Sequence, residues 1–343
     1  MRIAIVTDAW LPQVNGVVRT LGQTIREATA AGHEVSVISP ADFRTVPCPT
    51  YPEIRLALFP GRRVRRRLDE LRPDAVHVAT EGPLGLAARN WCVRRGWPFT
   101  TAYHTQFPEY VRARAPIPLR AGYAAVRWFH GRAARTLVTT PSMMRHLEAH
   151  GFRNLTLWGR GVDTDLFRPR GKDFLDLPRP VWLYIGRVAV EKGVEDFLKL
   201  DLPGTKLVVG DGPAAADLRV RYPDAVYAGY RHGEDLAAHI AASDVFVFPS
   251  RTDTFGLVLL EAMACGVPVA AYPVTGPIDV VRNGITGVLD EDLRAAALAA
   301  LDLDPDACRA QALQNSWEAA TRQFLGSLAV ADARLEPIPV TPA

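Results

Sequence analysis

The sequence predicts an α/β protein with two Rossmann-like domains, because short apolar strand candidates alternate with helix patterns along the chain. Strands that alternate with helices form right-handed βαβ units, and such units build parallel sheets. The alternation stops at a polar stretch rich in Pro and Gly, 168–180, and then starts again. We therefore expect an N-terminal domain over 1–170 and a C-terminal domain over 171–315.

Each half offers its own series of apolar segments that end at turn residues. The first half offers 3–7, 34–39, 54–58, 75–78, 99–103, 136–140 and 155–157, and the second offers 181–185, 206–209, 225–228, 245–248, 267–271 and 287–289. Residues from about 316 to 330 follow the second series and read as an amphipathic helix. Ligands bind at the carboxyl ends of parallel strands, so both sheets are expected to face a central cleft that holds the site.

The composition is that of a soluble globular protein. The 343 residues suffice for two cores, and hydrophobic and charged residues make up 48% and 22% of the chain. No apolar run reaches the roughly 18 to 20 residues needed to span a bilayer, and the first residues read as a strand rather than a signal peptide. The four cysteines show neither CxxC nor metal-ligand spacing, so a reducing cytoplasm is the expected location.

The formal net charge of +3 hides an asymmetry between the two halves. Residues 1–170 carry 25 Arg, no Lys and 13 acidic residues, which gives +12. Residues 171–343 carry 15 basic and 24 acidic residues, which gives −9. Such a difference supports two domains with different partners, and a basic half is attracted to anionic lipid or to nucleic acid.

The segment 61–72, "GRRVRRRLDELR", holds six Arg and concentrates this positive charge. A solvated helix surface is the simplest interpretation. An Arg-rich segment also suits a membrane interface when aromatic residues accompany it, and the candidates here are Trp91, Trp97, Trp128 and Phe129. No nucleic-acid-binding module is recognised.

Two acidic residues separated by seven positions stand out in the second half. Glu261 lies inside an otherwise apolar helix pattern that Gly266 ends, and Asp253 precedes that helix. A buried carboxylate is costly unless a polar group meets it. A neighbouring backbone group or Arg for Glu261, and a helix-capping role for Asp253, form the structural alternative to a ligand-binding role.

Cations follow the first strand of the second half. Gly186 is followed by Arg187 and Lys192, and a second Gly-rich turn, "VVGDGP", occupies 208–213. Cations at the carboxyl end of a parallel strand are well placed for a diphosphate, because Arg can donate in a fork and Lys acts as a point charge. The alternative is a pair of solvated surface charges.

The first half offers weaker signals. Asn15 and Gly16 precede a helix, where Gly lets a phosphate approach the amides, although most Asn-Gly pairs are only turns. His104 follows a strand, where a role in the site competes with a structural one. Asp163-Thr164-Asp165 mimics a metal-binding DxD, but we interpret it as a turn and cap. Neither GxGxxG nor a Walker A motif is present.

These motifs together resemble the GT-B glycosyltransferases of family 4, the retaining group 1 enzymes. The resemblance covers nearly the whole chain and rests on "PQVNGVV", "GRVAVEKG", "GDGP", "SDVFVFPS" and the acidic pair that ends in "EAMACGVPV". Bacterial mannosyltransferases and glycolipid synthases resemble it most.

The resemblance implies a role for each position. Glu261 would bind the ribose, Asp253 the donor sugar, and His104 would lie near the sugar and the acceptor hydroxyl. Arg187 and Lys192 would neutralise the diphosphate. The implied catalytic residues are His104, Arg187, Lys192 and Asp253, and the implied donor-binding residues are Asn15, Gly16, Gly186, Arg187, Lys192, Asp253, Phe255, Gly256, Leu257 and Glu261.

The resemblance further implies that the helix at 316–330 crosses back onto the first domain, and that no metal or other cofactor is needed. The family pattern has Glu where this chain has Asp253, which puts the identity of the donor sugar in doubt but not the reaction class.

The resulting expectation is a retaining transfer of a hexose from a nucleotide diphosphate sugar, with a UDP-sugar favoured, to a membrane lipid such as diacylglycerol. The second domain would bind the donor and the first the acceptor, on the inner face of the cell membrane. A GDP-mannose-dependent mannosyltransferase acting on a polysaccharide or phospholipid glycan is the alternative. A nucleic-acid-binding protein is the alternative of another class, but it would leave Glu261 and the acidic half unexplained.

Overall fold

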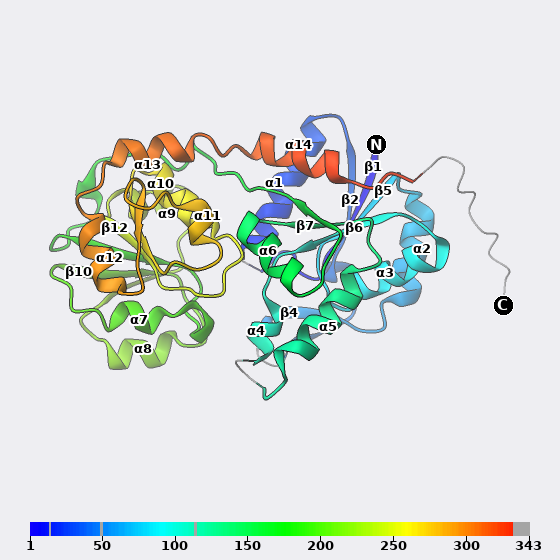
Figure 1. Cartoon of the computed structure of the whole chain (residues 1–343), viewed down its shortest axis with the longest axis horizontal. Coiled ribbons are helices and arrows are strands. Elements are labelled where there is room, and N and C mark those ends of the chain that lie inside the picture. The colour runs from blue at the N-terminus through cyan, green and yellow to red at the C-terminus, as the bar shows by residue number, and fades with distance from the viewer. Residues whose placement is uncertain (14, 49–50, 113–114, 332–343) are drawn as a thin grey trace. The chain divides into compact units, whose positions relative to one another are not determined.

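The computed structural model describes residues 1–13, 15–48, 51–112 and 115–331. It divides the chain into two compact units, shown in Figure 1. Unit 1 comprises Met1–Gly159 together with the chain from Glu318 onward, and unit 2 comprises Arg160–Trp317. The division between the units thus falls between Gly159 and Arg160, ahead of the stretch 168–180.

Unit 1 is built on a parallel sheet of six strands in the order β2-β1-β5-β6-β7-β8. The strands are β1 (Arg2–Val6), β2 (Glu34–Ile38), β5 (Ala75–Val78), β6 (Phe99–Tyr103), β7 (Arg135–Val138) and β8 (Leu155–Leu157). The order reverses between β1 and β5, which makes the carboxyl ends of these two strands the expected ligand-binding edge.

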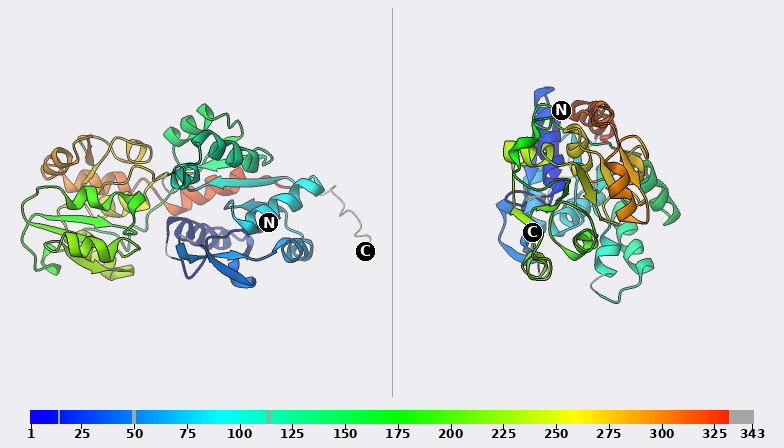
Figure 2. Two further views of the ribbon diagram at one scale, coloured as in Figure 1. Left: turned by 90° about the horizontal axis from the view of Figure 1, so that it is seen from below. Right: turned by 90° about the vertical axis from the view of Figure 1, so that its left-hand side faces the viewer.

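Helices lie on both faces of this sheet (Figures 1 and 2). Ala4 and Val6 face the core under α2 and α3, whereas Ile3 and Ile5 face the core that includes Leu21 of α1, as the two-residue repeat of a strand requires. The helices are α1 (Gly16–Ala30), η1 (Pro40–Asp42), α2 (Gly61–Leu71), α3 (Pro83–Arg95), α4 (Phe107–Arg112), α5 (Leu119–His130) and α6 (Pro141–Ala149).

The last helix, α14 (Trp317–Ser327), packs on unit 1 although it follows all of unit 2 in sequence. Phe324 is fully buried against Trp158 in the core that contains Ile3 and Ile5. The chain beyond α14 also pairs with β5, because Ala331 N donates to Asp74 O at 2.8 Å.

The predicted strand at 54–58 does not join the parallel sheet, which corrects that expectation. It forms part of β4 (Tyr51–Ala57), which pairs antiparallel with β3 (Thr45–Cys48) in a separate two-stranded sheet. The sequence pattern missed β3 because the strand has only four residues and contains Pro47, which argues against a strand. Every other predicted strand overlaps a strand of one of the two parallel sheets.

Unit 2 repeats the architecture with the strand order β11-β10-β9-β12-β13-β14, all parallel. The strands are β9 (Val181–Ile185), β10 (Thr205–Val209), β11 (Val226–Gly229), β12 (Val245–Phe248), β13 (Val269–Ala271) and β14 (Gly287–Leu289). This is the 3-2-1-4-5-6 order of dinucleotide-binding sheets, in which the ligand binds where the order reverses. That point lies between β9 and β12.

The unit 2 sheet is buried on both faces. Leu183 and Ile185 face a core with α9, α10 and α13, and Trp182 and Tyr184 face one with α7, α8 and α12. Both faces therefore need apolar residues, which explains the continuous run "VWLYI" in β9. The helices are η2 (Lys172–Phe174), η3 (Val190–Lys192), α7 (Val194–Leu198), α8 (Ala215–Arg221), α9 (Gly233–Ala241), α10 (Leu257–Ala264), α11 (Pro277–Val280), α12 (Leu293–Ala300) and α13 (Pro305–Ala312).

Membrane-spanning helices are not found in the described part of the chain, since none of its helices combines the required length with the required hydropathy.

Candidate active site

The reversal point of the unit 2 sheet carries the predicted cations. Gly186 and Arg187 directly follow β9, and Lys192 ends the short helix η3 that comes next. The hydroxyl of Tyr184 donates to the Arg187 carbonyl at 2.7 Å and so fixes the start of this loop. The sequence thus places both cations at the carboxyl end of a parallel strand.

The turn "GDGP" packs against this loop through backbone hydrogen bonds. Val188 N donates to Asp211 O and Ala214 N donates to Val188 O, both at 3.0 Å. Gly186 N also donates to Val209 O at 3.0 Å. The two Gly-rich turns that the sequence indicated are therefore one continuous structure at the ends of β9 and β10.

Lys192 and Asp253 form an ion pair, with 2.5 Å between Lys192 Nζ and Asp253 Oδ1. The side chains are only 23% and 19% exposed. The helix-capping alternative for Asp253 is wrong, because the residue that precedes α10 as its N-cap is Gly256. Asp253 instead belongs to the loop that follows β12, at the reversal point of the sheet.

Close backbone approach brings the two loops together. Gly193 has a φ of +63°, and a Cβ there would lie 2.6 Å from the Pro249 carbonyl oxygen. The Thr252 hydroxyl donates to the Glu191 carbonyl at 3.2 Å. On the other side, a Cβ on Gly276 would lie 2.9 Å from the Asp253 carbonyl oxygen. The backbone therefore fixes the positions from which Lys192 and Asp253 extend.

Glu261 lies on α10 and is 6% exposed, as the apolar helix pattern predicted. Phe255, Gly256 and Leu257 form the turn into this helix. Gly266, with a φ of +74°, follows the helix end as expected. A buried carboxylate on a helix that starts at the reversal point is suited to bind hydroxyl groups of a ligand.

Arg309 of α13 fixes the far end of this helix, a contact that sequence reasoning missed. Its guanidinium donates to the carbonyls of Ala264 at 2.9 Å, Phe167 at 2.7 Å and Thr164 at 3.0 Å. Backbone carbonyls at a helix end need such partners, and a cation there also complements the helix dipole.

In unit 1, Asn15 and Gly16 start α1. The Asn15 carbonyl oxygen Oδ1 accepts from Val18 N at 3.0 Å, so Asn15 is the N-cap. Its Nδ2 donates to Gln13 Oε1, and Gln13 Nε2 donates to the Asp8 carbonyl, both at 3.2 Å. Gln13 therefore ties the loop to the end of β1, a role that no sequence pattern indicated.

We expect Asn15→Ala to lower the free energy of unfolding of unit 1 by about 1 kcal/mol, because α1 loses its N-cap. Asn15→Ser keeps an acceptor at the same place and is expected to retain most of the stability. Urea unfolding of the three proteins measures this. Equal midpoints for the wild type and Asn15→Ala would contradict the capping role.

Asp8 occupies the reversal point of the unit 1 sheet. Its carboxylate accepts from Leu84 N at 2.9 Å, Gly85 N at 3.2 Å and the Thr80 hydroxyl at 2.9 Å. Burial raises the pKa of the Asp8 carboxyl, against the lowering effect of the two amide hydrogen bonds. The first amides of α3 therefore already donate to the Asp8 carboxylate. The other helix at this edge of the sheet, α1, begins with Gly16.

His104 follows β6 and contacts Trp158 edge to face, with 5.7 Å between the ring centroids. Asp163 forms the predicted turn, since its Oδ1 accepts from the amides of Asp165 at 3.2 Å and Leu166 at 3.0 Å. Clusters of three or more potential metal ligands are not found within the described residues.

The predicted site residues thus fall into two sets. Arg187, Lys192, Asp253 and Glu261 gather at the reversal point of unit 2, where Lys192 and Asp253 are in direct contact. Asn15, Gly16 and His104 lie at the carboxyl ends of strands in unit 1. Their roles toward a substrate stay predictions.

Comparison with known proteins assigns this arrangement to a class. "Glycosyltransferase Family 4" matches residues 14–166, and "Glycosyl transferases group 1" matches 179–303. Sucrose-phosphate synthase from Thermosynechococcus elongatus shares the fold, with a TM-score of 0.76, 21% identity and coverage of 95% of this chain and 97% of that one. Anabaena HepE in complex with UDP-glucose gives a TM-score of 0.71, 17% identity and coverage of 95% and 99%. The fold is that of the GT-B glycosyltransferases.

Curated relatives narrow the assignment. A GDP-mannose-dependent alpha-mannosyltransferase of Mycolicibacterium smegmatis is 36% identical over 84% of each chain. Its namesake from Corynebacterium glutamicum is 32% identical over 99% of this chain and 92% of its own. An alpha-monoglucosyldiacylglycerol synthase of Streptococcus pneumoniae is 24% identical over 89% and 79%. The chain belongs to the group 1 glycosyltransferases of family 4 and is a hexosyltransferase.

Proposed function

We propose that the chain transfers a hexose from a nucleotide diphosphate sugar to a membrane lipid such as diacylglycerol, with retention of configuration. Unit 2 would bind the donor and unit 1 the acceptor. The observation that carries the proposal is the group of Arg187, Lys192 and Asp253 at the reversal point of the unit 2 sheet. Two cations suit a diphosphate, and a carboxylate beside them suits sugar hydroxyls.

The reaction needs a leaving group that accepts charge. As the bond between the sugar carbon and the phosphate oxygen breaks, its electron pair goes to the diphosphate. Arg187 and Lys192 would stabilise this growing negative charge, and the Gly16 amide would assist. The acceptor oxygen would bond to the sugar carbon on the same face, and its proton would go to the departing phosphate. His104 would lie beside the reacting groups. No step requires a metal.

GDP-mannose is the donor that we propose, in place of the UDP-sugar favoured by the sequence alone. The support is the names of relatives that are 32% and 36% identical over most of both chains. The UDP-glucose complex of HepE, at 17% identity, supports only the fold. A thermal-shift panel of GDP, UDP and ADP with their hexose conjugates tests the choice. A larger stabilisation by UDP-glucose than by GDP-mannose would contradict it.

A cavity in unit 1 supports an apolar acceptor. It measures about 270 Å³ and is lined mainly by apolar residues of the loop after β1 and of the segment after β2, with Arg55 at one side. Its wall includes Trp10, Leu11 and Gln13, and Gln13 also contacts the loop that holds Asn15. The cavity therefore adjoins the loop that leads to Asn15 and Gly16 at the start of α1.

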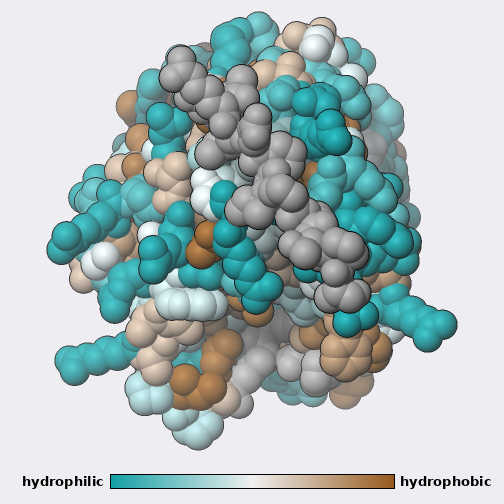
Figure 3. Space-filling model, turned by 90° about the vertical axis from the view of Figure 1, so that its right-hand side faces the viewer, coloured by the Kyte–Doolittle hydropathy of each residue, from teal (hydrophilic) through white to brown (hydrophobic). Residues whose placement is uncertain are grey.

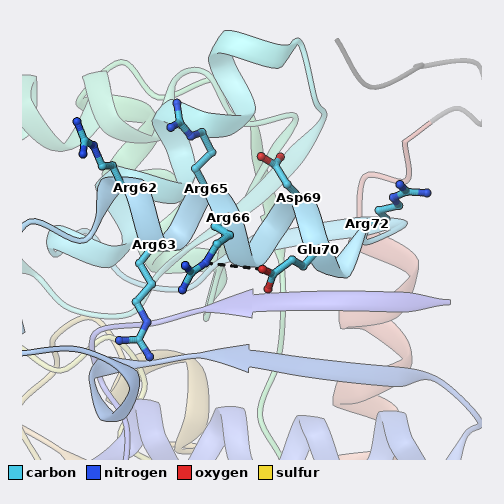
Figure 4. Close-up of a pocket in the computed structure, with 7 residues that line it drawn as sticks. All are labelled: Arg62, Arg63, Arg65, Arg66, Asp69, Glu70 and Arg72. Carbon is cyan, nitrogen blue, oxygen red and sulfur yellow. Dashed lines mark ion pairs between the residues drawn. The ribbon is translucent and has the colours of Figure 1, made fainter. Parts of the chain in front are cut away.

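The Arg-rich helix α2 supports a membrane location. Val64 and Leu68 are buried, while Arg62, Arg63 and Arg65 are exposed. Figure 4 shows these Arg side chains spread away from the helix, with Arg66 paired to Glu70 at 3.6 Å. Their net charge is thus available to an anionic partner.

An exposed aromatic side chain adjoins this helix. Phe59 lies just before Pro60, the N-cap of α2, and is 95% exposed, and its neighbour Leu58 is 43% exposed. Figure 3 shows the face that lies on the right-hand side in Figure 1, and this face is mainly hydrophilic with isolated hydrophobic patches. Apolar side chains beside basic ones are typical of a membrane-interface segment. Two aromatic residues named from the sequence do not contribute, because Trp91 and Phe129 are only 7% and 4% exposed.

We expect Arg62→Ala combined with Arg65→Ala to weaken binding to anionic vesicles about 30-fold, at about 1 kcal/mol for each basic residue. Vesicle flotation at low salt measures this, and added salt should weaken the binding of the wild type further. Arg145→Ala with Arg153→Ala removes the same charge from exposed positions outside α2. An equal loss in this control would contradict a specific role of α2.

A further inference from the structure

The ion pair between Lys192 and Asp253 joins two groups that the reaction needs for different parts of the donor. Lys192 is the proposed partner of the diphosphate, and Asp253 is the proposed partner of the sugar. Lys192 Nζ and Asp253 Oδ1 lie 2.5 Å apart. The other carboxylate oxygen of Asp253, Oδ2, is buried and makes no hydrogen bond within the described residues. Asp253 therefore depends strongly on Lys192 for compensation of its charge.

The two loops that carry Lys192 and Asp253 are joined to each other. Gly193 contacts the Pro249 carbonyl closely, and Thr252 donates to the Glu191 carbonyl. Because these contacts join the two loops, Asp253 cannot easily move away when an anion approaches Lys192. The two anionic groups must then share one ammonium group.

Sharing of the Lys192 ammonium group affects the binding of the donor and of the product differently. A nucleotide sugar carries hydroxyl groups that can donate to Asp253 and so replace Lys192 as its partner. After transfer, the nucleoside diphosphate has lost those hydroxyls and carries additional negative charge on its terminal phosphate. A carboxylate that must share its cation with this phosphate repels the phosphate, and this repulsion lowers the affinity for the product.

We propose that Asp253 competes with the diphosphate for Lys192, and that it thereby lowers affinity for the nucleoside diphosphate product relative to the sugar donor. Asp253 is then a determinant of donor selectivity and of product release. This inference rests on the proposed function, since it assumes that Lys192 binds the diphosphate.

The test compares dissociation constants for GDP and GDP-mannose by calorimetry, with UDP and UDP-glucose as a second set. Asp253→Asn keeps the size of the side chain and removes its charge. We expect this variant to bind the nucleoside diphosphate about tenfold more tightly and to bind the nucleotide sugar no more tightly. Unchanged or weaker binding of the nucleoside diphosphate would overturn the inference.

Two further variants separate competition from general charge effects. With Lys192→Met in the background, Asp253→Asn should give a much smaller gain, because the shared ammonium group is gone and only Arg187 remains near the diphosphate; an undiminished gain would overturn the competition. Asp217→Asn removes a carboxylate of unit 2 that pairs with Arg221 at 2.6 Å and is 65% exposed. A tenfold gain in this control would likewise overturn the inference.

Nucleotide binding by the wild type distinguishes a failure of the proposed function from a failure of the inference about Asp253. If the wild type binds none of the nucleotides or nucleotide sugars, the proposed function fails, and the inference fails with it. If the wild type binds them and Asp253→Asn leaves the affinity for the nucleoside diphosphate unchanged, only the inference fails.

Discussion

Lys192→Ala is expected to lower kcat/KM for hexose transfer by about 10²- to 10³-fold, because a preorganised charge that stabilises the leaving group is lost. The loss should appear mainly in kcat, since the diphosphate gains its additional charge in the transition state. Initial rates of transfer at varied donor concentration measure both parameters.

The matched control is Lys199→Ala. Lys199 is 59% exposed and pairs with Glu195 one helical turn away, so its removal changes the charge of unit 2 equally without touching the reversal point of the sheet. The thermal stability of the variant should be measured alongside the kinetics, because Lys192→Ala leaves Asp253 without its partner. A folded Lys192→Ala variant with near-normal turnover would refute the diphosphate assignment.

Glu261→Ala is expected to weaken nucleotide binding about 10- to 100-fold, the effect of losing hydrogen bonds from ribose hydroxyls to a charged acceptor. The discriminating measurement uses nucleotides that lack a ribose hydroxyl. The wild type should prefer the complete ribose, and the variant should lose most of that preference.

Met263→Leu is the control on the same helix, because it changes a fully buried neighbour of Glu261 with little change in volume. Its nucleotide affinity should stay close to that of the wild type. If Glu261→Ala discriminates against deoxyribose as strongly as the wild type does, the ribose-binding role is wrong.

The fold was predictable because both sheets are buried on two faces. Strands such as β9 must then be continuously apolar, and this makes them visible in the sequence as runs like "VWLYI". The hairpin of β3 and β4 was not predicted in its true pairing. A short two-stranded sheet outside the central sheet carries no comparable apolar run.

The site was predictable where glycine and charge follow a strand. Gly186, Arg187 and Lys192 lie at the carboxyl end of β9, so their position follows from strand order alone. The contact between Lys192 and Asp253 was not predictable, because 61 residues separate them and a close backbone approach at Gly193 brings them together.

Asp8 and Gln13 show a second limit of sequence reasoning. Asp8 binds the amides at the start of α3, and Gln13 links Asp8 to Asn15 through side-chain hydrogen bonds. Gln13 belongs to the segment "PQVNGVV", but that segment did not indicate which groups its side chain contacts, and Asp8 belongs to none of the motifs named from the sequence. The available signal was position, since an acidic residue two places after the first strand lies where the order of the sheet reverses.

The charge asymmetry also acquires a structural basis. The basic half corresponds largely to unit 1, and five of its Arg residues lie on α2, which follows the exposed Phe59. This distribution of charge supports the proposal that unit 1 binds an anionic lipid surface and that unit 2 binds the nucleotide.

Transfer of labelled sugar into lipid tests the central proposal most directly. The full chain is incubated with GDP-mannose carrying radiolabelled mannose and with anionic vesicles that contain diacylglycerol, and a parallel reaction uses labelled UDP-glucose. The proposal predicts label in the organic phase after extraction, more from GDP-mannose than from UDP-glucose, and far less with Lys192→Ala. Label that stays entirely in the aqueous phase with both donors would contradict a lipid acceptor.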